Sequence, residues 1–348
     1  MMNTTNQPIP DIPLTAHHIR FTVRAETPIA FHGFKGSALR GAFAGTLRRA
    51  FCPEAQRQPV DPLHKAICPA CQLLDAEQAS RQYGDIRRPY AIRPPLDGKQ
   101  NYLPGELLHF DVVLFGDKLT YFPYLIMTVQ RMGAEAGVGR RDQSGQRGRF
   151  SIQRVEAINP LTGELQSLLE AGDSMVRLPA LPITHAQVLT AAGRLLTALE
   201  QQNKCLTVHC RTPMRLMSGG QKVETAEFFP LAKQAVLRVL DLSAQHAGAR
   251  PDIRLKEDIY PFADRVMLVK DETHWWDLKG YSGRLERRQV LGGLMGRAVY
   301  RTEEWQPLLP WLMWGQIVQV GKNIVKGCGI YQLEAGAAIT NPTNDSGT

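Results

Sequence analysis

The feature that most constrains the fold of this chain is an order of sequence patterns that occurs twice. In the first half, "HHIRFTVRAE" alternates apolar and charged residues as a strand does, and Thr27-Pro28 precedes a helical stretch. In the second half, "KCLTVHCRTPMRL" alternates in the same way, and Thr212-Pro213 precedes the helical "EFFPLAKQAVLRVLDLSAQH". Further strands and a glycine-rich hairpin follow in each half. This order predicts an α+β chain built from two similar units.

The repeated order suits two ferredoxin-like (RRM-like) domains in tandem, each a split βαβ unit. The boundary is expected in "AGDSMVRLPALPITHAQ", because prolines and a turn-forming Gly-Asp interrupt the pattern there. The predicted domains are residues 1–178 and 179–335. Residues 336–348 are small and polar, and we expect a disordered tail. Residues from about 52 to 105 are predicted to form a loop-rich insertion in the first domain.

Charge and composition narrow the class of protein. The 348 residues include 41 Lys and Arg against 33 Asp and Glu, a net charge of +8. Such a balance is compatible with a nucleic-acid partner, and equally with an ordinary basic soluble protein. No apolar run approaches the roughly 20 residues of a membrane span, and the first residues lack a secretory signal. We therefore expect a cytoplasmic protein that has no membrane partner, and six reduced cysteines.

The first predicted helix contains glycines that helix propensity disfavours. Leu39, Phe43 and Leu47 recur every four residues, and Ser37 is expected to be the N-cap. A glycine inside a helix costs about 1 kcal/mol relative to alanine. We therefore expect a close approach to the helix backbone near Gly41 and Gly45, or a short helix.

The stretch "VGKNIVKGCGIYQLE" (residues 320–334) combines glycines and lysines before the last predicted strand. A P-loop requires GxxxxGK followed by Ser or Thr. From Gly321 the next glycine in step is Gly327, one residue too late, and Cys328 follows where lysine is needed, so this is not an NTPase loop. Glycines let backbone amides approach a phosphate chain closely, and lysines add charge. An ordinary hairpin turn is the alternative.

Two arginine-rich stretches favour binding to RNA or DNA. Arginine on glycine-rich loops suits phosphate contacts and base stacking. Either stretch alone is also explained by a solvated charged face. The arginines are Arg140, Arg141, Arg147, Arg149 and Arg154 in the first stretch, and Arg284, Arg287, Arg288, Arg297 and Arg301 in the second.

His32 is a candidate for proton transfer. It lies between the first strand and the first helix, three residues before Lys35. Unpaired amides at a helix N-terminus attract anions, so an imidazole beside a lysine could act as general acid or base on a phosphate. A histidine with a purely structural role in a loop is the alternative.

The cysteines of the insertion have the spacing of a metal site. Cys52, His64, Cys68 and Cys71 form a C-x11-H-x3-C-x2-C pattern. Three thiolates and an imidazole complete a tetrahedral zinc site, and four protein ligands leave no position for substrate. The pattern thus predicts a structural zinc that staples the insertion.

Taken together, these stretches resemble the RAMP-superfamily endoribonucleases that process CRISPR precursor RNA, in the branch with an extended C-terminal domain and a glycine-rich loop. The resemblance covers most of the chain. It is carried by "FKGSALRGAFAGTLRRAFCP", "CPAC", "GQRGRFSIQRV", "TPMRL", "WWDLKGYSGRLERRQVLGGLMG" and "VGKNIVKGCGIYQLE".

The resemblance implies cleavage of repeat RNA without a catalytic cofactor. The 2′-OH attacks the adjacent phosphate and leaves 2′,3′-cyclic phosphate and 5′-OH ends. By position, the family's catalytic histidine falls on His32, with Lys35 as its electrostatic partner. The RNA-gripping positions fall on Gly321, Lys322, Lys326, Gly327 and Gly329 in the loop, and on Tyr281, Ser282 and Arg284 upstream.

The implied partners are a repeat stem-loop RNA, the mature guide RNA and other CRISPR effector subunits, in antiviral defence. The chain departs from the family pattern where Lys279-Gly280 precedes Tyr281, and where His64 stands in for a fourth cysteine. A non-catalytic RAMP subunit that holds guide RNA is the main alternative, because it shares the fold and the basic loops. A zinc-stapled nucleic-acid-binding protein unrelated to CRISPR is a further alternative.

Overall fold

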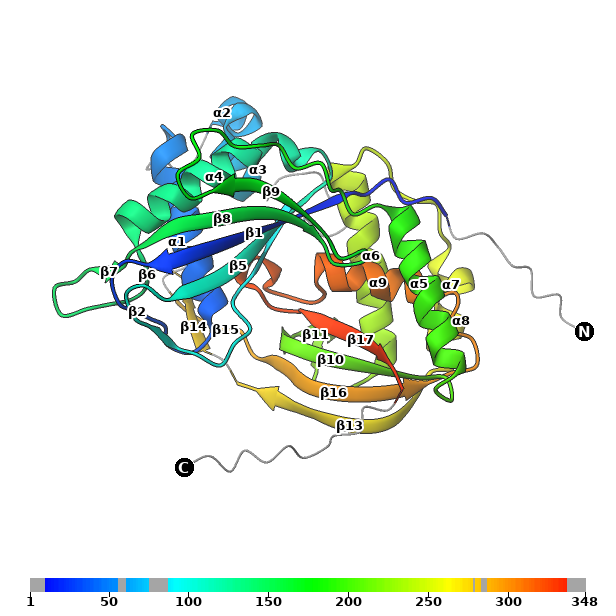
Figure 1. Ribbon diagram of the computed structural model, residues 1–348. Coiled ribbons are helices and arrows are strands. Elements are labelled where there is room, and N and C mark those ends of the chain that lie inside the picture. The colour runs from blue at the N-terminus through cyan, green and yellow to red at the C-terminus, as the bar shows by residue number, and fades with distance from the viewer. Residues whose placement is uncertain (1–9, 56–60, 75–86, 278, 283–286, 337–348) are drawn as a thin grey trace, which may run out of the picture.

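The computed structural model describes residues 10–55, 61–74, 87–277, 279–282 and 287–336, and the side chains of these except 279–282 and 287–290 (Figure 1). Two antiparallel sheets organise the molecule. Figure 1 shows the first sheet at the upper left and the second below it. None of the described helices is long and apolar enough to cross a membrane.

The first sheet has the strand order β3-β5-β1-β8-β9. Its strands are β1 (Ala16–Ala25), β3 (Tyr90–Arg93), β5 (Leu107–Phe115), β8 (Phe150–Asn159) and β9 (Glu164–Glu170). Along the chain, helix α1 (Lys35–Phe51) lies between β1 and β3, and α4 (Phe122–Arg131) lies between β5 and β8. This is the βαββαβ connection of a ferredoxin-like unit, with β9 added at the edge.

The second sheet repeats this order as β13-β16-β10-β17. Its strands are β10 (Cys205–Met214), β13 (Met267–Trp276), β16 (Gly293–Arg301) and β17 (Tyr331–Ala335). Helix α6 (Phe228–His246) follows β10, and α9 (Leu309–Val318) joins β16 to β17. The prediction of two tandem ferredoxin-like units in an α+β chain is therefore confirmed.

Smaller elements decorate both units. The first carries β2 (Ile29–Ala30), α2 (Pro62–Ile67), α3 (Pro69–Leu74), β4 (Asn101–Tyr102), η2 (Gly116–Tyr121), η3 (Met132–Ala136), β6 (Val138–Arg141) and β7 (Arg147–Gly148). The second carries α5 (His185–Glu200), β11 (Leu216–Ser218), β12 (Gln221–Val223), α7 (Leu255–Asp258), α8 (Tyr260–Ala263), β14 (Lys279–Ser282), β15 (Arg287–Val290) and η4 (Ile324–Lys326).

Two local predictions were wrong. Helix α1 begins at Lys35, so Phe34 and not Ser37 occupies the N-cap position. The insertion is shorter than residues 52–105, because β3 within that range pairs with β5 in the first sheet. A four-residue strand followed directly by prolines is too short for its alternation to stand out.

The two units share apolar core. Ala16, Val113 and Phe115 of the first sheet belong to the same buried cluster as Val236 and Val239 of α6. The predicted boundary at 178/179 falls between β9 and α5 and stays a prediction. The predicted tail lies outside the described residues, except for Gly336.

A buried ionic group sits on the first sheet. Asp111 accepts a hydrogen bond of 2.9 Å from Arg20 Nε at Oδ1, and its Oδ2 lies 2.8 Å from His18 Nε2. Burial opposes ionisation of Asp111, but His18 and Arg20 outweigh it and hold the pKa of the carboxyl well below its usual range. Asp111 therefore stays charged at neutral pH, with both oxygens paired.

Replacing Asp111→Asn is expected to lower the free energy of unfolding by about 3–5 kcal/mol, because it leaves buried donors and a cation without their anion. The folded pKa lies below the unfolded value, so this stabilisation is present at neutral pH. It is lost as the pH falls below about 4. Urea unfolding at pH 7 and pH 3 measures both effects. Asp117→Asn, which removes an exposed pair with Lys118, is the matched control. Equal losses in the two variants would contradict the expectation.

Candidate functional site

The N-terminus of α1 meets a loop from the opposite end of the sequence. Gly36 lies directly against the carbonyl oxygen of Lys326, and a Cβ at Gly36 would overlap that oxygen. Phe34 packs edge-on against Trp276, with 6.2 Å between ring centroids. His32, exposed in the turn before α1, therefore lies where the two units touch. This junction is the candidate site.

The loop at residues 320–329, called here the glycine-rich loop, is shaped by its own packing. Gly321, Gly327 and Gly329 all have positive φ. A Cβ at Gly327 would overlap the Pro94 ring, and one at Gly329 would overlap the carbonyl oxygen of Val320. Only glycine suits such positions, since it alone adopts positive φ at no steric cost and leaves room for the neighbour.

The amides of the glycine-rich loop already have partners within the protein. The amides of Lys322, Lys326, Gly327 and Gly329 donate to the carbonyls of Arg215, Asn323, Ile324 and Pro213, respectively. Gly327 and Gly329 are also buried. The hypothesis that these amides hold a phosphate chain does not fit this arrangement. The glycines instead fold the loop so that its lysine side chains are presented.

The cations at the junction come from both sides. Lys322 is exposed and Lys326 is half-buried; burial, and then the charge of Arg40, lower the pKa of Lys326. Arg40 follows Gly36 by four residues and so shares its face of α1. The site thus combines an imidazole with cations from α1 and the loop, which suits a phosphate group.

Arg40 was not among the predicted site residues. Its spacing from Gly36 could have indicated it. A helical glycine that contacts another backbone marks the face of the helix where that contact is made, and a residue four positions later lies on the same face. Arg40 Nε is buried with no hydrogen-bond partner among the described residues, and the same holds for Ser37 Oγ.

Lys35 has a different environment from the one its predicted role requires. It is 4% exposed, and its ammonium donates to the carboxylate and carbonyl oxygens of Asp97 and to Tyr102 Oη at 3.1 Å. A lysine has three donors, and these contacts use all of them. Lys35 therefore ties α1 to the segment before β4, and its predicted electrostatic role in catalysis stays untested.

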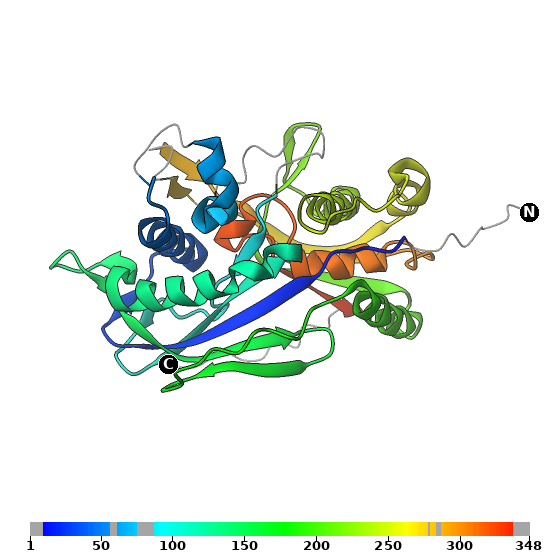
Figure 2. The ribbon, with the colours of Figure 1, turned by 90° about the horizontal axis from the view of Figure 1, so that it is seen from above.

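The other predicted RNA contacts come from two hairpins. Arg140, Arg141, Arg147 and Arg149 are exposed on the β6–β7 hairpin, which projects beside α1 in Figure 2. Tyr281 and Ser282 lie in β14, and the backbone of β14 pairs with β15. Arg284 lies outside the described residues.

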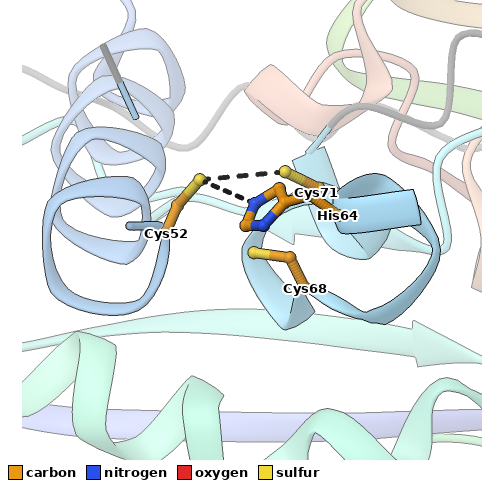
Figure 3. Close-up of side chains that lie close together, drawn as sticks. All are labelled: Cys52, His64, Cys68 and Cys71. Atoms are coloured by element: carbon orange, nitrogen blue, oxygen red, sulfur yellow. Dashed lines mark hydrogen bonds between the residues drawn. The ribbon is translucent and has the colours of Figure 1, made fainter. Parts of the chain in front are cut away.

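The predicted metal ligands come together at the other end of α1 (Figure 3). The ligand atoms of Cys52, His64, Cys68 and Cys71 all lie within 4.8 Å of one another. Cys52 Sγ is 3.8 Å from Cys71 Sγ and 3.4 Å from His64 Nε2. Tetrahedral zinc with Zn–S bonds of about 2.3 Å places two sulfurs about 3.8 Å apart, so the cluster fits this ion.

Comparisons with known proteins agree with this architecture. A family model described as the AF_1859 N-terminal domain matches residues 14–181, and the model of the CRISPR-associated endoribonuclease Cas6 matches residues 208–331. Residues 208–331 therefore form a Cas6-type endoribonuclease domain. The resemblance stated from the sequence is thereby confirmed, and the family places the chain among endoribonucleases that act in CRISPR RNA processing. No curated protein sequence matches the chain.

Solved structures show the same fold at low identity. Cas6 from Thermus thermophilus is 12% identical, with a TM-score of 0.53 over 92% of this chain and 99% of that one. A Cas6 product complex gives the same score and covers 100% of that chain. A chain of a partial Cas6-RT-Cas1–Cas2 complex is 12% identical, with a TM-score of 0.54. The match covers 93% of this chain and 47% of that one.

The two glycines of α1 provide a matched test of the junction. Gly36→Ala forces α1 away from Lys326, so the free energy of unfolding is expected to fall by about 1–3 kcal/mol. Gly41→Ala meets nothing within 4 Å and is expected to stabilise the helix by about 1 kcal/mol. Urea unfolding measures both, and a repeat-RNA cleavage assay reports whether the junction is disturbed. A Gly36→Ala variant as stable and active as Gly41→Ala would contradict this geometry.

Proposed function

We propose that this protein cleaves precursor CRISPR RNA within its repeats by attack of a ribose 2′-OH on the adjacent phosphate. The 2′ oxygen forms a bond to phosphorus, and the bond from phosphorus to the next 5′ oxygen breaks. The products are a 2′,3′-cyclic phosphate and a 5′-OH. The observation that carries the proposal is the exposed His32 at the junction of α1 with the lysine-bearing glycine-rich loop.

His32 is assigned to proton transfer. The reaction needs one group to remove the 2′-OH proton and one to protonate the leaving 5′ oxygen, and imidazole is suited to either step near neutral pH. Its position in an exposed turn leaves it open to a bound strand.

Lys326 and Arg40 are assigned to charge stabilisation. Negative charge grows on the non-bridging phosphate oxygens in the transition state, and preoriented cations stabilise it there. Both side chains are held close to the surface, and burial lowers the pKa of Lys326. A bound phosphate would favour the charged form of this lysine. In this proposal cleavage needs no catalytic metal ion, because these side chains stabilise the negative charge of the phosphate.

His32→Ala is expected to slow cleavage of a labelled repeat hairpin about 10²–10⁴-fold in EDTA, since a positioned acid or base contributes that much. His109→Ala, which removes an exposed histidine of β5, is the matched control and should cleave as the parent does. A 2′-deoxy substitution at the scissile nucleotide should abolish the reaction. Gel analysis of the ends, with and without phosphatase treatment, identifies the cyclic phosphate.

Three outcomes would revise the proposal. No cleavage by the parent protein favours a subunit that holds guide RNA without cutting. Undiminished cleavage by His32→Ala keeps the enzyme and removes this histidine from its mechanism. Cleavage of the 2′-deoxy substrate would rule out attack by the 2′-OH.

The proposed RNA partner is the repeat stem-loop, with the mature guide RNA as product. One similar structure is a Cas6 product complex and another a Cas6-RT-Cas1–Cas2 complex, which supports an RNA product and other CRISPR subunits as partners. The residues proposed to contact RNA are Lys322 and Lys326 in the loop, Arg140, Arg141, Arg147 and Arg149 on the hairpin, and Tyr281, Ser282 and Arg284 upstream. Gly321, Gly327 and Gly329 shape the loop that presents the lysines.

We also propose that Cys52, His64, Cys68 and Cys71 hold a structural zinc ion. The four ligand atoms fit a closed tetrahedral site, so the ion would have no position for substrate. Burial and then Cys68 raise the pKa of the Cys71 thiol without metal, and a bound dication would deprotonate it. The ion would join Cys52, at the end of α1, to α2 and α3 (Figure 3).

Metal analysis of protein purified without chelator is expected to give one zinc per chain. Cys71→Ser should lose most of this zinc and lower the Tm, because the site ties α2, which has no buried residue, to α1 and α3. Cys205→Ser, a partly exposed cysteine of β10, is the control and should keep both. Full zinc retention in Cys71→Ser would contradict the ligand set. Zinc measured after the EDTA cleavage assay separates this structural ion from any role in catalysis.

A further inference from the structure

A cavity of about 600 Å³ lies between α1 and the β6–β7 hairpin. Four arginines line it, three on the hairpin side and one near the end of α1. The facing side of α1 offers Ser37 and small residues. We call it the arginine cleft: Arg49, Arg141, Arg147 and Arg149, with Ser37, Ala38, Gly41 and Ala42.

The charge of the arginine cleft suits an anionic ligand. Its arginines are exposed, and none has a carboxylate partner within the described part of the chain. The one acid among the lining residues is Glu135. Arg141 and Arg147 donate to the carbonyls of Gly145 and Gly139, so the hairpin itself holds them in place. Arginines oriented in this way bind phosphate oxygens at a small loss of side-chain entropy.

Gly41 shows that the protein leaves this space open. A Cβ at Gly41 would meet nothing within 4 Å, so no part of the described chain approaches the helix there. The close approach expected from the sequence is thus absent within the protein itself. Ala38 and Ala42 extend the same smooth surface along α1. A ligand can therefore lie directly against the helix backbone.

The position of the arginine cleft relates it to the candidate site. It begins at Ser37, next to Gly36, which contacts Lys326. From Ser37 to Arg49 the helix rises about 18 Å at about 1.5 Å per residue. A pocket of about 300–1,000 Å³ buries a ligand of drug size, so this cleft has room for a short unpaired strand but not for a duplex.

We propose that the arginine cleft binds an unpaired stretch of the RNA strand that flanks the cleavage site. The phosphates lie on Arg141, Arg147 and their neighbours, and the strand passes over Gly41. This inference rests on the proposed function, because the cleft leads away from the junction where His32 is assigned to the reaction. The repeat duplex lies outside the cleft.

The test measures binding in a His32→Ala background, so that cleavage does not interfere. Three RNAs are compared: a repeat hairpin alone, the hairpin with an unpaired 5′ extension, and the hairpin with an unpaired 3′ extension. An extension at one end is expected to tighten binding by at least about tenfold, as charge-assisted hydrogen bonds to phosphate allow. Arg141→Gln with Arg147→Gln should remove this gain, so that the double variant binds the extended RNA no more tightly than it binds the bare hairpin.

Two further measurements sharpen the test. For the extended RNA, the double variant should make the salt dependence of log K shallower by about 1.4, since each phosphate contact of a single strand contributes about 0.7. Gly41→Leu should also remove the gain, because its side chain fills the cleft, without lowering the Tm. The matched control is Arg177→Gln with Arg265→Gln, which removes the same charge from arginines paired with Asp173 and Glu304.

Each outcome decides between explanations. The inference is overturned if neither extension tightens binding, if the bare hairpin loses as much affinity as the extended RNA, or if the control variant behaves like the double variant. An equal loss of affinity for all three RNAs would mean that the arginines attract RNA through their general positive charge and do not bind the unpaired strand specifically. Failure of the proposed function shows itself separately, as no cleavage of the hairpin by the parent protein.

Discussion

The contact between Gly36 and the carbonyl of Lys326 is the interaction on which the candidate site depends. It lets α1 of the first unit abut the glycine-rich loop of the second with no side chain between them. His32 lies in the turn before α1 and Arg40 on α1, while Lys322 and Lys326 belong to the loop. A phosphate at this junction would meet groups from both units at once, so their relative placement decides whether the site exists.

Helix α1 is held along its whole length by features remote in sequence. Its first turn is tied to Asp97 and Tyr102 through Lys35 and abuts the glycine-rich loop. At its other end, Cys52 belongs to the cysteine–histidine cluster (Figure 3). Between these ends, Leu39, Phe43 and Leu47 bury one face in the core. The opposite face is left open, where it forms one wall of the arginine cleft.

Regular patterns in the sequence predicted the elements well. Alternating strands such as β1 and β10 and the four-residue spacing in α1 and α6 reflect local geometry, which a single chain shows directly. The metal-ligand spacing was also informative, because α2 and α3 bring His64, Cys68 and Cys71 together locally. The start of α1 and strand β3 were missed, since their positions are set by packing against distant segments rather than by local preference.

The sequence by itself determined the tandem ferredoxin-like architecture, the family, and the residue types available for RNA chemistry. Only the tertiary structure decided what those residues do. In the structure the Lys35 ammonium already donates to Asp97 and Tyr102, and Gly327 and Gly329 shape the loop. Arg40 lies close enough to Lys326 for its charge to affect that lysine. The structure also shows that Gly41 faces open space. The physical reason is that burial, hydrogen-bond partners and free volume are properties of contacts between distant segments, and periodicity along the chain does not encode them.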